Sequence, residues 1–357
     1  MEQIKNVIAM LDFISGSAFC VENGVIIGAN EAARRHNIIT GTAVQDLLLT
    51  GKEEYASFTD GCLYLTLNLS DLPYGASVTR VNGIDIFQLQ QESDQADLQM
   101  MALAAQELRQ PLSSVMAIAD SLFPITEQQV DPDMQDQAAR INRGLFQMLR
   151  IISNMSDAYR YNRELSGRQE TRDICAVIEE VFQNTADMVE HTGTKLHFTG
   201  LKESIYCLVD QEKLERAINN ILSNALKFSP KGSTIEASLK RKEKMLYLTV
   251  QDNGSGIHEQ MRSSLYSRYR REPGIEDSRH GIGLGMVLIR SAAAAHGGTV
   301  LLENNEQGTR LTMTLRIRQS KEPLVRTGIL RVDYAGERDH RLLEFSDSLP
   351  ASLYTNE

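Results

Sequence analysis

Hydrophobic and polar positions follow different patterns in successive parts of the chain. In residues 1–91, short β-branched and aromatic runs such as GVIIGAN and CLYLTLNL alternate with Gly, Asn and Asp, which is typical of strands joined by turns. The pattern predicts a small α/β domain with a sheet of about five strands. One interpretation of this region's role is a regulatory or dimerising module that holds no ligand.

Residues 92–168 change to a helical pattern, in which apolar residues recur with gaps of four and three along two stripes. Pro124 and Pro132 stand between the stripes and predict an antiparallel hairpin of two helices. Because a hairpin alone leaves its stripes uncovered, we expect a homodimer with a four-helix bundle; packing of the stripes onto flanking domains of a monomer is the alternative. The stripes consist of Met101, Ala105, Leu108, Leu112, Val115, Ala119 and Leu122, and of Ile141, Leu145, Met148, Ile152, Met155 and Tyr159.

Residues 169–319 alternate between helical and strand patterns, which predicts an α/β sandwich with helices on one face of a mostly antiparallel sheet. The tail at 320–357 is charged and carries only short apolar groups such as LLEF, so the sequence predicts no structure for it. The predicted fold class is α+β multidomain. It comprises a small α/β domain at 1–91, a helical hairpin at 92–168, an α/β-sandwich domain at 169–319 and the C-terminal tail.

Composition and charge narrow the classes of function. The net charge of −10 argues against nucleic-acid binding and against anionic membrane surfaces. No apolar stretch approaches the roughly 18 residues that a membrane-spanning helix needs, so we expect no membrane span. The four cysteines, Cys20, Cys62, Cys175 and Cys207, form no CxxC pair, which indicates neither a disulfide framework nor a zinc site. A cytoplasmic protein is the simplest expectation.

One predicted helix carries candidate chemistry in the segment LERAINNILSNALKFSP (214–230). Asn220, Asn224 and Lys227 fall at i, i+4 and i+7, so they share one face of a helix whose other positions are apolar. Mg²⁺ prefers oxygen ligands and leaves room for phosphates, and a lysine adds positive charge nearby. The face predicts a metal-phosphate site, and an ordinary solvated helix face is the alternative.

Two glycine-containing segments add to this site. In VQDNGSGI (250–257) a strand delivers Asp252 to its end, where Gly254 and Gly256 allow close backbone approach. In RHGIGLGMVLI (279–289) three glycines open a helix, whose free N–H groups favour phosphate. The segment lacks the βαβ context of a dinucleotide fingerprint, and the chain has no GxxxxGK[ST] loop. These three glycines are Gly281, Gly283 and Gly285.

In this order the segments resemble the ATP-binding domain shared by histidine kinases, type II topoisomerases, Hsp90 chaperones and MutL repair proteins. The resemblance implies ATP and Mg²⁺ as cofactors, with Asp252 receiving the adenine amino group and Asn224 holding magnesium with help from Asn220. It also implies a mobile lid between Ile257 and Gly281. The later segments AAAAHGGTV and GTRLTMTL follow the histidine-kinase version, with Gly308 and Thr309 at its final turn. The water-activating members place a glutamate where Asn220 stands, so hydrolytic function is disfavoured.

The helical hairpin carries a second resemblance, because ELRQPL (107–112) is similar to the core of the HELRxPL motif of sensor histidine kinases. Gln106 occupies the position of the phosphate-accepting histidine, one residue past Ala105 on the apolar stripe, and should project outward. A glutamine amide has no nucleophilic ring nitrogen, so autophosphorylation at this position should be absent. The resemblance to this family covers roughly residues 95–318. In the first region, ENGVIIGANEAARRHNI (22–38) resembles the opening of a PAS-type sensory domain.

The leading hypothesis is therefore a histidine-kinase-like two-component signalling protein that binds Mg-ATP, lacks autophosphorylation and acts as a pseudokinase on partners through its conformation. Three alternatives stay open. The chain could phosphorylate a partner in trans, or it could be a response-regulator phosphatase in which Glu107 and Gln110 act one helical turn apart. A non-catalytic interaction scaffold is the third. A response regulator or a partner kinase is the expected partner, while the input signal and whether the chain is an enzyme are not decided by the sequence.

Overall fold

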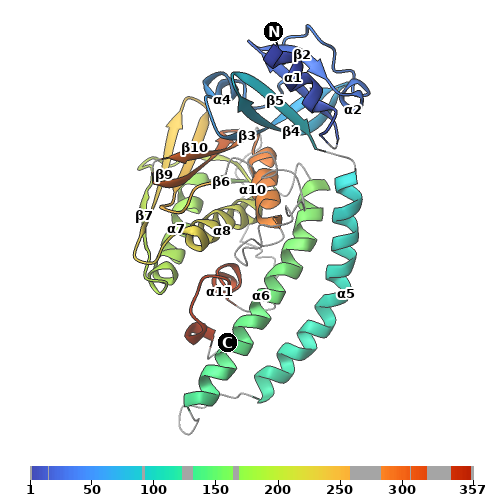
Figure 1. The fold of residues 1–357 in the computed structure, drawn as a ribbon. Coiled ribbons are helices and arrows are strands. Elements are labelled where there is room, and N and C mark those ends of the chain that lie inside the picture. The colour runs from blue at the N-terminus through green and yellow to red at the C-terminus, as the bar shows by residue number, and fades with distance from the viewer. Residues whose placement is uncertain are drawn as a thin grey trace.

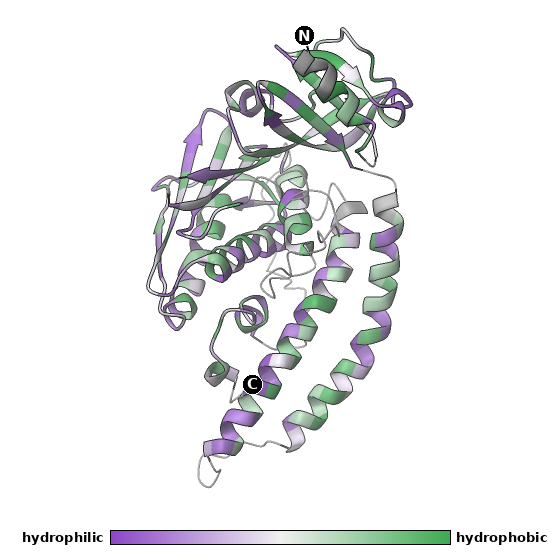
Figure 2. Ribbon diagram, viewed as in Figure 1, coloured by the Kyte–Doolittle hydropathy of each residue, from purple (hydrophilic) through white to green (hydrophobic). Residues whose placement is uncertain are grey.

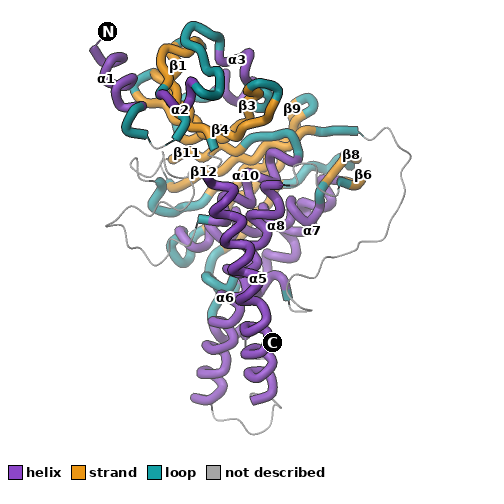
Figure 3. The backbone as a smooth tube through the Cα atoms, turned by 90° about the vertical axis from the view of Figure 1, so that its right-hand side faces the viewer, coloured by secondary structure: helices purple, strands orange, loops and turns teal. Residues whose placement is uncertain are grey.

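The computed structural model describes residues 2–14, 16–90, 93–122, 132–163, 169–257, 283–305, 307–319 and 339–354. In these ranges, ten strands form one sheet in the order β2-β1-β5-β4-β3-β11-β12-β10-β9-β7 (Figure 1). The sheet therefore runs without a break from the N-terminal region into the region that was expected to hold a nucleotide. A long helical hairpin extends away from it (Figure 3).

The N-terminal region contributes five of these strands and four short helices. Phe19 and Phe87 stack in its core with ring centroids 4.7 Å apart, and both side chains are fully buried. Burying each such side chain stabilises the fold by roughly 1.5–3 kcal/mol. The elements are α1 (Glu2–Leu11), β1 (Ala18–Glu22), β2 (Val25–Ala29), α2 (Glu31–Arg34), α3 (Val44–Leu47), α4 (Lys52–Ser57), β3 (Cys62–Leu69), β4 (Leu72–Val81) and β5 (Ile84–Leu89).

The N-terminal region joins the following α/β region by direct strand pairing. Strand β3 pairs antiparallel with β11 (Val300–Asn305), and Cys62 lies opposite Leu302 while Tyr64 lies opposite Val300. The Tyr64 ring also receives the Arg290 guanidinium at 5.1 Å from its centroid. We call this contact the strand junction. The sequence patterns did not predict it.

The hairpin consists of α5 (Ser93–Leu122) and α6 (Pro132–Arg163), which pack along each other. Alternate members of the predicted stripes are covered: Ala105 and Leu112 are buried, whereas Leu108 and Val115 are about half exposed at 50% and 51%. Figure 2 shows hydrophobic positions recurring along both helices. The hairpin thus keeps an uncovered apolar face in this chain. Of the described helices, none is long and apolar enough to cross a bilayer.

The α/β region places helices on one face of its strands (Figure 3). Strands β12 (Gly308–Arg316), β10 (Met245–Gln251) and β9 (Thr234–Lys242) are antiparallel neighbours, and β7 (Lys195–Thr199) pairs parallel with β9. The remaining elements are the two-stranded pair β6 (Glu170–Asp173) and β8 (Tyr206–Val209), and helices α7 (Ile174–Glu190), α8 (Gln211–Phe228) and α10 (Leu284–Ala295). The fold is therefore α+β, as the sequence patterns predicted.

The end of the chain also has structure, although the sequence predicted none. Helix α11 (His340–Glu344) and the 3₁₀ helix η1 (Ala351–Tyr354) lie against α6, and α11 also contacts α8 (Figure 1). Leu342, Leu343 and Phe345 are buried there. We call residues 339–354 the C-terminal segment.

Candidate nucleotide-binding site

Asp252 follows the last residue of β10, and its carboxylate is held by the backbone around it. Oδ1 accepts N–H bonds from Gly254 at 2.8 Å and from Thr309 at 3.0 Å. Burial raises the pKa of Asp252, and these two bonds offset part of that rise. Because both bonds use Oδ1, the directions around Oδ2 suit an N–H donor of a ligand. The structure thus brings Asp252, Gly254 and Thr309 together.

Gly254 fits this position because a side chain has no room there. A Cβ on Gly254 would lie 2.8 Å from the carbonyl oxygen of Phe228 and 2.9 Å from Oδ1 of Asp252. The end of α8 and the end of β10 therefore approach each other through the backbone. Gly256, two residues later, adopts the left-handed region at φ 72°.

The polar face of α8 meets the first turn of α10. Asn220 is 1% exposed, and its Nδ2 donates to the carbonyl oxygen of Arg216 at 2.8 Å. Its Oδ1 faces Gly285, where a Cβ would lie 2.8 Å away. Asn224 and Lys227 follow on the same face and are half-buried. An amide oxygen, a second amide and an ammonium group are thus aligned beside a helix N-terminus.

Helix α10 begins just after Gly283, which adopts φ 79° as its N-cap residue. The first N–H groups of a helix have no partner within it, and the helix dipole favours negative charge at this end. The same end therefore suits phosphate. Gly281 and most of the predicted lid between Ile257 and Gly281 lie outside the described residues.

The residues predicted on the hairpin are separate from this pocket and lie on α5. Gln106, Glu107 and Gln110 are all exposed, while Ala105 beside them is 1% exposed. Because Gln106 is exposed while its neighbour Ala105 is buried, the acceptor position lies on the outward side of the helix. Chemistry at these residues therefore requires either movement of the pocket or a separate partner.

A buried histidine connects helices α8 and α10, which carry the candidate site. His296 is 2% exposed; its Nδ1 lies 2.8 Å from the carbonyl oxygen of Ala292, and its Nε2 accepts the N–H of Asp210 at 3.1 Å. This pairing requires the neutral tautomer with the proton on Nδ1. Burial lowers the pKa of His296 to about 4. Its role is to connect the end of α10 to the start of α8.

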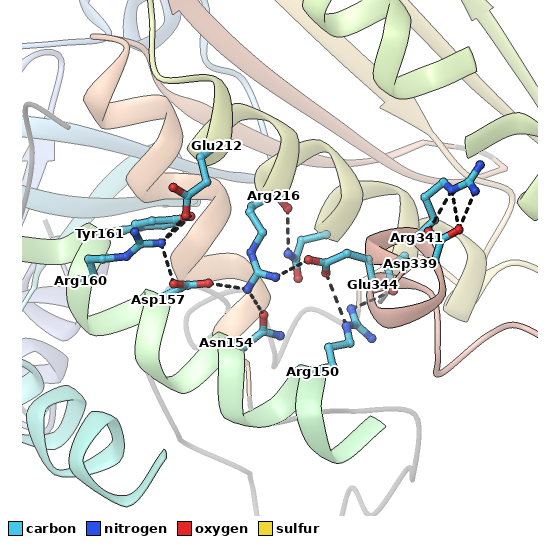
Figure 4. A network of polar contacts seen from close by, with 12 residues as sticks. Arg150, Asn154, Asp157, Arg160, Tyr161, Glu212, Arg216, Asp339, Arg341 and Glu344 are labelled. Atoms are coloured by element: carbon cyan, nitrogen blue, oxygen red, sulfur yellow. Dashed lines mark hydrogen bonds and ion pairs between the residues drawn. The ribbon is translucent and has the colours of Figure 1, made fainter. Parts of the chain in front are cut away.

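A network of charged side chains beside the pocket was missed by sequence reasoning (Figure 4). Arg216 of α8 is 1% exposed and pairs with Glu344 of α11, which is fully buried. The Nη2 atom of Arg216 also lies 2.7 Å from Oδ2 of Asp157 and 2.9 Å from Oδ1 of Asn154, both on α6. Three helices therefore meet at one guanidinium group. The available signal was a glutamate inside the apolar group LLEF.

A second arginine extends the network toward the pocket. Arg150 of α6 donates to Oδ2 of Asp347 at 2.7 Å and to Oγ of Ser223 at 2.9 Å. Its Nε lies 3.8 Å from Oε2 of Glu344. The same Asp347 oxygen lies 3.7 Å from Nζ of Lys227. We call these contacts, with those of Arg216, the charged junction.

Comparisons with known proteins agree with the fold of the α/β region. Residues 209–319 match the family described as histidine kinase-, DNA gyrase B-, and HSP90-like ATPase. The chain is 32% identical over 209 residues to the swarming motility regulation sensor protein RssA of Serratia marcescens, covering 56% of this chain and 42% of that protein. It is 28% identical over 243 residues to the sensor histidine kinase WalK of Bacillus subtilis, covering 65% and 39%. The chain thus spans about two-fifths of the length of these relatives.

A solved structure shares the fold. Full-length ShkA in complex with AMPPNP superposes with a TM-score of 0.50 at 18% identity, covering 63% of this chain and 47% of that chain. Residues 209–319 are therefore an ATPase domain of the histidine kinase, gyrase and HSP90 class. Over 56% and 65% of its length, respectively, the chain is similar to RssA and to the sensor histidine kinase WalK.

Proposed function

We propose that this chain is a two-component signalling protein that binds Mg-ATP and does not phosphorylate itself at the acceptor position. One observation carries the proposal: two backbone hydrogen bonds, from Gly254 and Thr309, fix the Asp252 carboxylate, whereas the exposed acceptor position on α5 holds Gln106. A glutamine amide cannot attack phosphorus as an imidazole does, because its nitrogen lone pair is delocalised. ATP then acts as a ligand that selects a conformation.

The residues present fit the nucleotide. Asp252 would accept the adenine amino group, since its carboxylate is fixed by two backbone donors. Asn224 and Asn220 would supply oxygen ligands to Mg²⁺, which takes few protein ligands and keeps phosphates in its shell. Lys227 and the N–H groups at the start of α10 would hold the phosphates. Gly254, Gly256, Gly283 and Gly285 would let the backbone approach them.

We further propose that the chain works as a homodimer of hairpins. The half-exposed stripe residues support it, because an apolar face of this length is unfavourable in water. The N-terminal region, which contributes five strands to the sheet, would be a PAS-like sensory domain. The exposed apolar residues of the hairpin are Met100, Leu103, Leu108, Val115, Ile118, Met134, Ile141, Met148 and Ile151.

A second candidate function is a response-regulator phosphatase. Glu107 and Gln110 are both exposed on α5 and lie one helical turn apart. The amide of Gln110 could position water against a phospho-aspartate on a partner. This activity would survive the absence of an acceptor histidine, because it uses no phosphate on this chain.

The test is incubation of the purified protein with γ-labelled ATP and Mg²⁺, beside Gln106→His and Asp252→Asn variants. We expect the native protein to bind nucleotide without acid-labile label, Gln106→His to gain label and Asp252→Asn to lose binding. Label on the native protein would overturn the proposal and point to another acceptor residue. Loss of phosphate from a phosphorylated response regulator only when Gln110 is intact would favour the phosphatase instead.

A further inference from the structure

The C-terminal segment lies beyond the matched residues 209–319, and it is seated between the hairpin and the ATPase domain (Figure 1). Its apolar side chains enter the same core as α6 and α8. Tyr354 is fully buried, its ring lies edge-on to Phe146 with centroids 5.2 Å apart, and its hydroxyl donates to the carbonyl oxygen of Leu342 at 2.7 Å. The segment is therefore folded onto the surface that it covers.

Side chains of α6 hold the segment through its backbone. Arg143 and Gln147 donate to the carbonyl oxygen of Ser346 at 3.0 and 3.1 Å. Asn142 donates to the carbonyl oxygen of Tyr354 at 3.1 Å. These bonds fix where the segment crosses α6, and they place Asp347 opposite the last turn of α8.

Asp347 then meets a residue that the nucleotide would use. Its Oδ2 lies 3.7 Å from Nζ of Lys227, and the Lys227 side chain is 15% exposed. Lys227 shares one face of α8 with Asn220 and Asn224. This carboxylate also pairs with Arg150 at 2.7 Å, so it compensates part of the lysine charge, which is then weaker toward a phosphate group.

The contacts also allow the segment to leave. When Glu344 departs, Arg216 keeps Asp157 and Asn154, so its buried charge retains partners. Arg150 loses Glu344 and Asp347 but keeps a hydrogen bond to the neutral hydroxyl of Ser223. A buried charge left without a partner is strongly destabilising, and the remaining contacts reduce that cost.

We propose that residues 339–354 are a regulatory segment that competes with the phosphates of the bound nucleotide for Lys227 and holds the ATPase domain against α6. The proposal rests on the proposed function of the pocket. Because coupling between two ligands of one site is reciprocal, nucleotide releases the segment and the segment weakens nucleotide binding. The surface between α6 and α8 is thus a docking site for an acidic, aromatic-ended peptide, and the chain supplies that peptide itself.

The test compares the affinity for Mg-AMPPNP of the native protein, Asp347→Asn and Asp46→Asn. Asp46 is exposed on α3 and serves as the matched charge control. We expect Asp347→Asn to bind about two- to fivefold more tightly, the effect of removing one partly exposed ion pair, and Asp46→Asn to match the native protein. Unchanged or weaker binding by Asp347→Asn would overturn the proposal.

Hydrogen exchange of residues 340–354 is the second measurement. We expect Mg-AMPPNP to accelerate exchange in this segment of the native protein and not in Asp252→Asn, which lacks the adenine contact. Bound nucleotide with unchanged exchange in the segment would contradict competition. Absence of nucleotide binding by the native protein and by Asp347→Asn alike would instead refute the proposed function of the pocket.

Discussion

The ATPase domain is attached to its neighbours by two junctions of different chemistry. At the strand junction, β3 and β11 pair through backbone groups, and neither partner in these hydrogen bonds carries a net charge. At the charged junction, Arg150 and Arg216 meet Glu344 and Asp347 through side chains. A backbone ladder responds little to competing ions, whereas a carboxylate on a lysine can be displaced by another anion. The comparison indicates a fixed attachment to the N-terminal region and a releasable one to the hairpin.

The largest expected effect comes from Glu344→Ala at the charged junction. Glu344 is fully buried against Arg216, and Arg216 keeps Asp157 and Asn154 without it, so its removal should lower the free energy of unfolding by about 3 kcal/mol, the low end of the cost of breaking a buried ion pair. The charge-neutral Glu344→Gln keeps a hydrogen-bond acceptor and should lower it less. Urea denaturation followed by hydrogen exchange in α8 and α11 measures both. Unchanged protection of these helices in Glu344→Ala would show that the junction does not depend on this pair.

The strand junction is tested by Gly61→Ala with Gly83→Ala as its control. Both glycines have positive φ, 98° and 80°, so alanine should cost about 1–3 kcal/mol at either position. A Cβ on Gly61 would also collide with the backbone of Leu302 in β11, whereas one on Gly83 meets nothing within 4 Å. We expect only Gly61→Ala to accelerate hydrogen exchange at the β11 amides that face β3. Equal exchange at those amides in the two variants would contradict a tight junction.

The smallest expected effects concern pH, to which the strand junction and the C-terminal segment should respond in opposite directions. Burial raises the pKa of Glu54, which is also hydrogen-bonded to Thr314 of the ATPase domain. The carboxyl group of Glu54 therefore holds its proton more tightly in the native state than in the unfolded state, where its pKa is 4.5. The unfavourable contribution is present above the native pKa and disappears as the pH falls toward 4.5. Protection at the strand junction should thus rise on mild acidification, and Glu54→Gln should remove that rise; a rise that persists in Glu54→Gln would assign it to another group.

Asp339, at the start of the C-terminal segment, should respond in the opposite direction. Burial alone would raise its pKa, but hydrogen bonds from Arg341 outweigh burial and lower it overall. Its contribution to stability is present above 3.8, the pKa of Asp339 in the unfolded state, and is lost as the pH falls through the lower pKa of the native state. Thermal denaturation below pH 4, with Asp339→Asn as control, checks this sign. A segment that gains stability in acid would contradict it.

The α+β class and the ATPase domain could be predicted because their signals are local. Asn220, Asn224 and Lys227 lie on one face of a single helix, and Asp252 follows the end of a single strand with Gly254 and Gly256 close behind it. The two junctions could not be predicted in this way. Arg216 and Glu344 are 128 positions apart, and nothing near either residue shows that they meet. The pairing of β3 with β11 depends on which strand edges remain free after each region has folded, and alternation along a strand does not encode that.

The four cysteines give the molecule native reporters of its own opening. All four are buried and outside any disulfide, and burial raises the pKa of Cys20, Cys175 and Cys207 to about 11. Cys62 lies opposite Leu302 at the strand junction. Since a buried thiol reacts with an alkylating reagent only after local unfolding, its modification rate reports the rate or the equilibrium of that opening. Cys62 would therefore record separation of the N-terminal region from the ATPase domain without any introduced label.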